Sequence, residues 1–123
     1  MSETQLLRDI LQRSSAAGQR LFRNQVGKYQ LMDGRWLSSG LCVGSADLIG
    51  WTPIVIDASM VGRTVAIFTA VETKAPRGRV SSEQARFIAA VQAQGGIGVV
   101  ARAPEDVTRA LEEFKRACVD GRP

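Results

Sequence analysis

The fold is decided by Ala70-Val-Glu-Thr-Lys-Ala-Pro-Arg-Gly-Arg-Val-Ser-Ser-Glu-Gln84, a stretch that indicates a strand, a basic turn and the start of a helix. Successive side chains of a strand point to opposite faces, so Glu72 and Lys74 share one face and Thr73 takes the other. A carboxylate and an ammonium group next to a cationic turn indicate a metal-assisted site that acts on phosphate. The alternative interpretation is an ion pair on the surface, at the end of a strand.

The strand that leads into this pair is the longest β signal in the chain, and we predict that it spans 65–74. Both of its faces are largely apolar, which is typical of a central strand that is covered on both sides. Charged groups at the end of a buried strand are unfavourable unless they have partners. This pattern weighs against a simple surface ion pair.

Apolar residues at helical spacing predict three helices. They span 2–17, 81–94 and a last segment that starts at Pro104. Ser2 is the expected N-cap of the first helix and Gly18 its stop. Ser81 and Gln84 have the spacing of a capping box at the start of the second helix.

Shorter strands are predicted around this framework, at 20–26, 29–32, 45–51, 53–57 and 97–101, and 36–44 is expected to be an irregular loop. A strand–helix–strand unit over 65–101 favours a parallel pair of strands. We therefore predict one α/β domain over 1–123, a sandwich with a mixed sheet.

Composition excludes several kinds of site. The chain has 123 residues and no histidine, so Ser-His or Cys-His nucleophiles and His-based zinc sites are excluded. Cys42 and Cys118 lie far apart in the sequence, and we expect buried thiols in a reducing, cytoplasmic compartment. No apolar run approaches the roughly 18–20 residues that span a bilayer, so no membrane partner is expected.

Positive charge is concentrated in two segments, 18–35 and 74–86. Each has four cationic residues against one acid, a net charge of +3. Such segments fit a polyanionic partner, although a solvated surface explains them equally well. The cations expected to contact phosphates are Arg23, Lys28, Arg77, Arg79 and Arg86.

Four further groups complete the candidate site. Asp47 follows Gly44-Ser45 near the start of the strand 45–51, and with Glu72 it provides two carboxylates for one or two Mg²⁺ ions. The backbone carbonyl of Thr73 is a further candidate ligand. Gln84 lies on the inner face of its helix, as a cap, a site residue or both. Glu3 lies at the edge of the first helix's apolar stripe, where it either favours the helix dipole or faces the site.

Three blocks of sequence resemble the VRR-NUC domain, a branch of the PD-(D/E)XK nuclease superfamily. In order, they are Gly44–Gly50 (GSADLIG), Glu72–Lys74 (ETK) and Gly78–Gln84 (GRVSSEQ). The segment Phe22–Gly27 also resembles the Arg-Asn segment that precedes the aspartate in this family. The resemblance covers 3–107. It implies a restriction-endonuclease-like α/β/α sandwich with a central mixed β-sheet, and a Mg²⁺- or Mn²⁺-dependent nuclease that acts on DNA.

Carried over to this chain, the resemblance makes Asp47 and Glu72 metal ligands, Lys74 the catalytic lysine and Gln84 a site residue. Glu3 is the best match for a glutamate on the family's first helix. One departure is at position 73, where the family more often has an apolar residue. The threonine side chain points away from the predicted site, so we expect little consequence.

Stand-alone copies of this size resemble phage or prophage enzymes that cut Holliday junctions as dimers. The leading hypothesis is therefore a structure-selective DNA endonuclease that acts on branched DNA as a homodimer in a bacterial host cell. One alternative is a less selective flap or single-strand nuclease. The other is a non-catalytic, basic DNA-binding module.

Overall fold

The computed structural model of the chain describes residues 2–119. Its first helix, α1 (Glu3–Ala16), begins and ends where its flanking residues predict. The Ser2 hydroxyl accepts a hydrogen bond of 3.1 Å from the Gln5 N–H, one of the groups at a helix start that have no partner within the helix. Gly18 follows the helix with a φ of 83°, in the left-handed region that glycine adopts without strain. The predicted first helix is confirmed.

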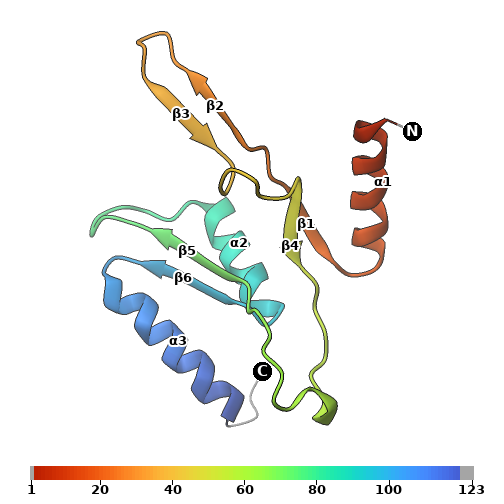
Figure 1. Cartoon of the computed structure of the whole chain (residues 1–123). Helices are drawn as coiled ribbons and strands as arrows, with labels where there is room; N and C mark the ends of the chain where they lie inside the picture. Colours follow the sequence, from red (N-terminus) through yellow and green to blue (C-terminus); the bar gives the residue numbers. More distant parts are fainter. Residues whose placement is uncertain (1, 120–123) are drawn as a thin grey trace. The chain divides into compact units, whose positions relative to one another are not determined.

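Two antiparallel strand pairs follow α1 in the first of two compact units, Met1–Ile54 (Figure 1). They are β1 (Arg20–Arg23) with β4 (Leu48–Trp51), and β2 (Gly27–Gln30) with β3 (Trp36–Ser39). The prediction of an irregular loop over 36–44 is wrong for its first four residues. The side chains of β3 do not alternate between apolar and polar, so only the pairing with β2 reveals the strand.

The β1–β4 pair depends on a close approach of two backbones. A Cβ atom built on Gly50 would lie 1.7 Å from the carbonyl oxygen of Arg20, so only a residue without a side chain fits here. Beside it, the rings of Phe22 and Trp51 pack at a centroid distance of 5.6 Å. This packing stabilises the pairing of β1 with β4, the strand that Asp47 directly precedes.

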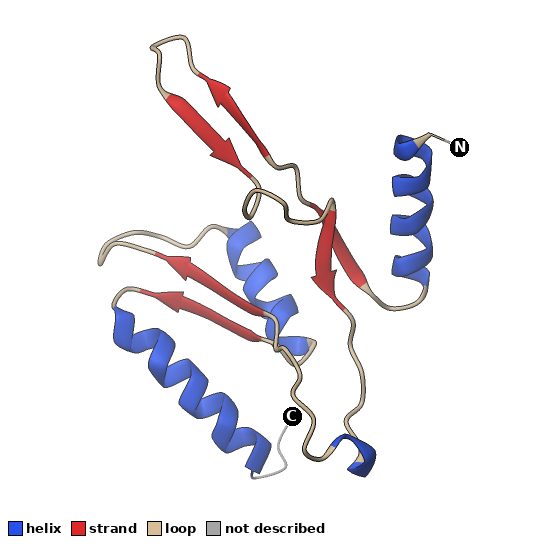
Figure 2. Cartoon of the chain, in the orientation of Figure 1, coloured by secondary structure: helices blue, strands red, loops and turns tan. Residues whose placement is uncertain are grey.

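The second unit, Val55–Pro123, is a parallel strand pair with two helices (Figure 2). After the short 3₁₀ helix η1 come four elements in the order strand, helix, strand, helix. β5 and β6 pair in parallel, as predicted. Helix α2 packs against both strands and α3 against β6, around the buried side chains of Val91 and Ala101. The bounds are η1 Ala58–Met60, β5 Thr69–Thr73, α2 Ser82–Ala93, β6 Ile97–Ala101 and α3 Pro104–Val119.

Strand β5 is shorter than predicted, because it begins at Thr69 and not at residue 65. Its partner β6 starts at Ile97, directly after the Gly95-Gly96 turn, so the residues before Phe68 have no strand opposite them in this pair. Val71 is 42 % exposed on the face opposite Glu72. The prediction that this strand is covered on both faces is therefore wrong within this unit. Helix α2 covers the face of β5 with Glu72, whereas α3 packs against β6 and leaves the Val71 face of β5 partly exposed.

The strand predicted at 53–57 is also absent from the described residues. Asp57 instead caps η1, where its carboxylate accepts hydrogen bonds from the Ser59 hydroxyl and the Ser59 N–H. Both bonds hold the pKa of Asp57 below its ordinary value, and the bond from the Ser59 hydroxyl has the larger effect. A capping aspartate ends the extended segment that the apolar residues before it favour.

Both cysteines are exposed, so the prediction of buried thiols is wrong. Cys42 lies in the loop after β3, and Cys118 follows the half-buried Ala117, where the helical turn directs it towards solvent. Within residues 2–119, no helix is long and apolar enough to cross a membrane.

Candidate active site

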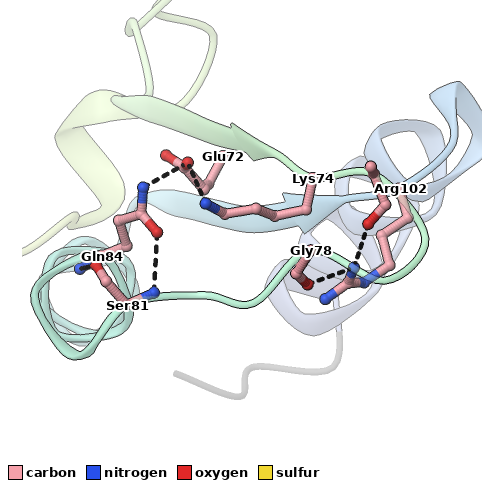
Figure 3. Close-up of polar contacts among 7 residues, drawn as sticks. Glu72, Lys74, Gly78, Ser81, Gln84 and Arg102 are labelled. Carbon is pink, nitrogen blue, oxygen red and sulfur yellow. Dashed lines mark hydrogen bonds and ion pairs between the residues drawn. The ribbon is translucent and has the colours of Figure 1, made fainter.

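Strand β5 ends in the charged pair that the sequence singles out (Figure 3). The Lys74 Nζ lies 3.5 Å from the Glu72 Oε1, and the two side chains are only 20 % and 32 % exposed respectively. The pair is therefore shielded from solvent on most of its surface. It differs from an exposed ion pair, which contributes little because water screens it.

Gln84 connects this pair to the start of α2. Its Nε2 donates a hydrogen bond of 2.7 Å to the Glu72 Oε1, and its Oε1 accepts the Ser81 N–H at 2.9 Å. The Ser81 hydroxyl in turn accepts the Gln84 N–H at 3.1 Å, which completes the capping box. This arrangement is compatible with Gln84 as a helix cap and as a site residue, because its side chain caps α2 with one end and holds the Glu72 carboxylate with the other.

The backbone of Thr73 faces away from β6. The Lys74 N–H donates to the Ala101 carbonyl at 3.0 Å, so the peptide groups of Lys74 point towards β6. Since successive residues of a strand direct their backbone groups to alternate edges, the N–H and C=O of Thr73 point to the other edge of β5. Among the described residues no strand pairs with that edge, which leaves a carbonyl oxygen of the kind that Mg²⁺ binds.

A tight turn follows Lys74. The Gly78 N–H donates to the Ala75 carbonyl at 2.9 Å, with Pro76 at the second position of the turn, as in a type I β-turn. A Cβ atom at Gly78 would lie 3.3 Å from the Ala75 oxygen and 3.5 Å from the Lys74 Cδ. Glycine at this position therefore lets the turn lie close against the stem of Lys74.

In the first unit, Glu3 and Asp47 line one groove of about 840 Å³, between α1, the end of β1 and the start of β4. Arg23 and Asn24 line it too. Glu3 and Asp47 are far apart in the sequence, and both are candidate site residues. The structure places them on one concave surface. Two carboxylates and a guanidinium in one groove suit a metal with a bound phosphate.

The segment that carries Asp47 is held by Asn24, which sequence reasoning does not assign to the site. The Asn24 Nδ2 donates to the Ser45 Oγ at 2.7 Å and to the Ala46 carbonyl at 2.9 Å, and its Oδ1 accepts the Leu41 N–H at 2.9 Å. The Asn24 N–H donates to the Asp47 carbonyl at 2.8 Å. The available signal is its place in Phe22–Gly27, the segment that resembles the family's Arg-Asn segment, but the resemblance assigns no role to Asn24.

Arg102 is a second residue that holds part of the candidate site and that the sequence leaves unassigned. It follows β6, and its guanidinium donates to carbonyl groups of the turn after Lys74 (Figure 3). No motif in the sequence marks it, because its acceptors are backbone groups that lie more than 20 residues away.

The five cations expected to contact phosphate are all exposed. Arg23 lies in the groove, Lys28 on β2, and Arg77 and Arg79 at the turn after Lys74. The Arg86 guanidinium lies 3.9 Å from the Glu83 carboxylate, in an exposed pair on α2. All five are accessible to a polyanion.

The acids are distributed between the two units, with Glu3 and Asp47 in the first and Glu72 in the second. Within the described part of the chain, no group of three or more acids, cysteines or histidines is placed to hold a metal ion. Mg²⁺ does not need such a cage, because it keeps several waters and binds through one or two carboxylates and substrate phosphates. Carboxylate and carbonyl oxygens are the donors that it prefers.

The comparison with protein families covers all of these residues. The family model described as VRR-NUC domain matches residues 2–105, which include the groove acids, the end of β5 and Gln84. Neither the curated proteins nor the solved structures include one that matches the chain significantly. The VRR-NUC fold is restriction-endonuclease-like, and its nuclease activity implies DNA as the substrate. Because the match covers most of its length, the chain belongs to the VRR-NUC domain family of nucleases.

Proposed function

We propose that this nuclease is a Mg²⁺- or Mn²⁺-dependent, structure-selective DNA endonuclease that resolves Holliday junctions. The observation that carries the proposal is the shielded Glu72–Lys74 pair, which Gln84 holds beside a basic turn. The family match crosses both compact units and supports one nuclease domain.

Three groups are proposed to hold the metal: the carboxylates of Asp47 and Glu72 and the backbone carbonyl of Thr73. Gln84 and Lys74 both engage the Glu72 Oε1, which leaves the Oε2 of the same carboxylate for a metal. When bound, the metal neutralises charge on the scissile phosphate and lowers the pKa of a water molecule. Glu3 is proposed to support Asp47 from the same groove.

Lys74 is proposed as the catalytic lysine. Its ammonium group is tethered to Glu72 and largely shielded from solvent, so its position is restricted before DNA binds. There the ammonium form orients the attacking water or offsets the negative charge that develops on the phosphate in the transition state, whereas the neutral amine form would accept the proton of that water. Gln84 fixes the carboxylate on which this geometry depends.

The exposed cations are proposed to bind the DNA backbone. Contacts from arginine and lysine to phosphate position a duplex without reading its sequence, and they weaken as salt rises. Binding that depends strongly on salt and weakly on sequence is therefore expected. Selectivity then arises from the shape of the DNA.

A Holliday junction has two-fold symmetry, so paired cuts need two active sites. We therefore propose a homodimer, since a two-fold dimer presents two copies of one site in a matching arrangement. Sedimentation analysis of the purified protein measures this directly. A monomeric mass at the concentrations used for cleavage contradicts the dimer.

The test of the function is a panel of four-way, flapped, single-stranded and linear DNAs, each incubated with Mg²⁺ or with EDTA. Paired symmetric cuts in the four-way substrate, abolished by EDTA, support the proposal. Equal cutting of flaps or single strands favours the less selective nuclease. Binding without cleavage under both conditions favours the DNA-binding module and overturns the proposed activity.

A further inference from the structure

One nitrogen of Arg102 holds three carbonyl groups of a single turn. The Nη1 lies 2.7 Å from the Ala75 oxygen, 2.9 Å from the Gly78 oxygen and 3.3 Å from the Pro76 oxygen. Arg102 follows Ala101, the residue of β6 that pairs with Thr73. It therefore reaches from the end of one strand to the turn that leaves the other (Figure 3).

The start of α3 fixes the backbone from which this side chain extends. The Asp106 Oδ2 accepts the Arg102 N–H at 2.8 Å and the Ala103 N–H at 3.1 Å. Both bonds hold the pKa of the Asp106 carboxyl below its ordinary value, and the bond from the Arg102 N–H has the larger effect. The carboxylate is therefore ionised at neutral pH and anchors the backbone of Arg102.

The position of the carbonyls determines where the N–H groups of the turn point. In a trans peptide the C=O and the following N–H point in opposite directions, and the described residues contain no cis peptide. Because the Pro76 and Gly78 oxygens face Arg102, the N–H groups of Arg77 and Arg79 face away from it. In the described part of the chain neither donates to another residue, and both side chains are exposed.

We propose that Arg102 is a positioning residue that presets the turn 75–79 to bind a DNA backbone phosphate through the N–H groups and guanidinium groups of Arg77 and Arg79. Backbone N–H groups of a turn that have no partner in the protein and point outwards can bind an anion, and here the Gly78 N–H between them holds the turn closed. The turn starts one residue after Lys74, so the phosphate that it binds lies next to the one attacked. This inference rests on the proposed nuclease function for the identity of the anion.

The experiment compares Arg102→Met with Arg116→Met, a matched change of an exposed arginine on α3. The Kd for a labelled four-way DNA is measured in EDTA, and KM and kcat are measured with Mg²⁺. We expect Arg102→Met to raise Kd and KM about tenfold and to leave kcat within about threefold, because it removes hydrogen bonds from a charged donor. Arg116→Met should match the wild type.

A double-mutant cycle separates positioning from direct contact with DNA. If Arg102 acts through the turn, Arg102→Met raises Kd by a smaller factor in the background of Arg77→Gln with Arg79→Gln than in the wild type, because the guanidinium contacts of the turn are already lost. Fully additive effects, or a wild-type Kd and KM for Arg102→Met, overturn the inference.

A conservative variant keeps the inference testable if Arg102→Met fails to fold, which thermal melting shows. Arg102→Lys keeps the charge but has a shorter reach, and it should still raise Kd about threefold. A wild-type Kd for Arg102→Lys assigns the effect to charge alone and overturns positioning. The two proposals fail separately: absence of cleavage by the wild type defeats the nuclease function, whereas the Kd cycle in EDTA tests the turn independently.

Discussion

The Nε2 of Gln84 donates a hydrogen bond of 2.7 Å to the Oε1 of Glu72, while the Oε1 of the same glutamine accepts the backbone N–H that caps α2. The two ends of one amide thus serve two purposes, the stability of a helix and the orientation of a carboxylate. Substitutions that retain one end and not the other can separate these roles.

Gln84→Glu is expected to lose far more activity than its loss of stability explains. A glutamate at this position also accepts the Ser81 N–H in a capping box, so the free energy of unfolding should fall only through the lost bond to Glu72 and the added repulsion, by about 1–2 kcal/mol. It has no N–H for Glu72 and places a like charge beside it, so the single-turnover cleavage rate should fall about 10–100-fold. Melting curves and quenched-flow cleavage measure the two effects.

Ser81→Ala is the matched control, because it removes the other half of the capping box and leaves the bond to Glu72. It should lower the free energy of unfolding by about 1 kcal/mol. The cleavage rate of the folded enzyme should stay within about threefold of the wild type. A loss of activity in both variants in proportion to their stability would contradict a separate role for the Gln84 amide.

Lys74→Ala is expected to abolish cleavage in Mg²⁺ and to leave binding to branched DNA. The reason is that its ammonium group lies beside the proposed metal-binding carboxylate, whereas the exposed arginines bind the DNA backbone. Cleavage assays and binding titrations should be run beside Lys115→Ala, an exposed lysine on α3. Undiminished cutting by Lys74→Ala would show that the site is assigned wrongly.

Asp47→Asn is expected to weaken the response to metal. Replacing one of two proposed carboxylate ligands removes a negative charge, so the Mg²⁺ concentration for half-maximal cleavage should rise by about tenfold or more. Glu3→Gln should cause a smaller shift, since Glu3 is proposed only to support Asp47. Asp9→Asn is the control, because Asp9 lies on α1 but does not line the groove. Equal metal responses in all three variants would remove Asp47 from the site.

Asp106→Asn is expected to change how stability depends on pH. The hydrogen bonds from Arg102 and Ala103 lower the pKa of Asp106 in the folded state below its ordinary value of 3.8. Its contribution is therefore fully present above that value and is lost as the pH falls through the lowered folded-state pKa. Urea unfolding at several acidic pH values should show a shallower loss of stability in Asp106→Asn than in the wild type. Asp57, whose pKa is also lowered, leaves a residual dependence of the same sign.

Gly50→Ala is expected to destabilise the β1–β4 pair. The added Cβ would lie 1.7 Å from the Arg20 oxygen, so the two backbones must separate, and the free energy of unfolding should fall by about 1–3 kcal/mol or more. Gly27→Ala is the control, since its nearest neighbour, the Ser39 Oγ, is at an ordinary distance of 3.7 Å. Equal stabilities of the two variants in denaturant titrations would contradict this close approach.

Sequence patterns predict the elements of the fold that have local causes. The capping box at Ser81 and the left-handed glycine at Gly95 set the ends of α2, and the short apolar run at Ile97–Ala101 is β6 as expected. Strand limits depend on the partner strand, which local patterns do not specify. The extent of β5 and the existence of β3 therefore emerge only from their pairing.

The residues of the candidate site also fall into those that sequence patterns predict and those that only the structure reveals. Glu72, Lys74 and Gln84 are predictable together because strand and helix periodicities place them on facing surfaces. Asn24 and Arg102 are given no role by the sequence because all their partners except the Ser45 hydroxyl are backbone groups of other segments. Any residue type has these groups, so they leave no signature in the sequence.

The open edge of β5 affects how the protein behaves at high concentration. A strand edge that pairs with no other strand, as this one does within residues 2–119, is a template for other chains, and here it includes the partly exposed Val71. Arg77 and Arg79, in the turn that follows β5, are exposed and carry positive charge beyond the end of this edge, and charged side chains at strand edges discourage self-association. The turn proposed to bind DNA therefore also favours colloidal solubility, and light scattering should accompany every assay of its neutral variants.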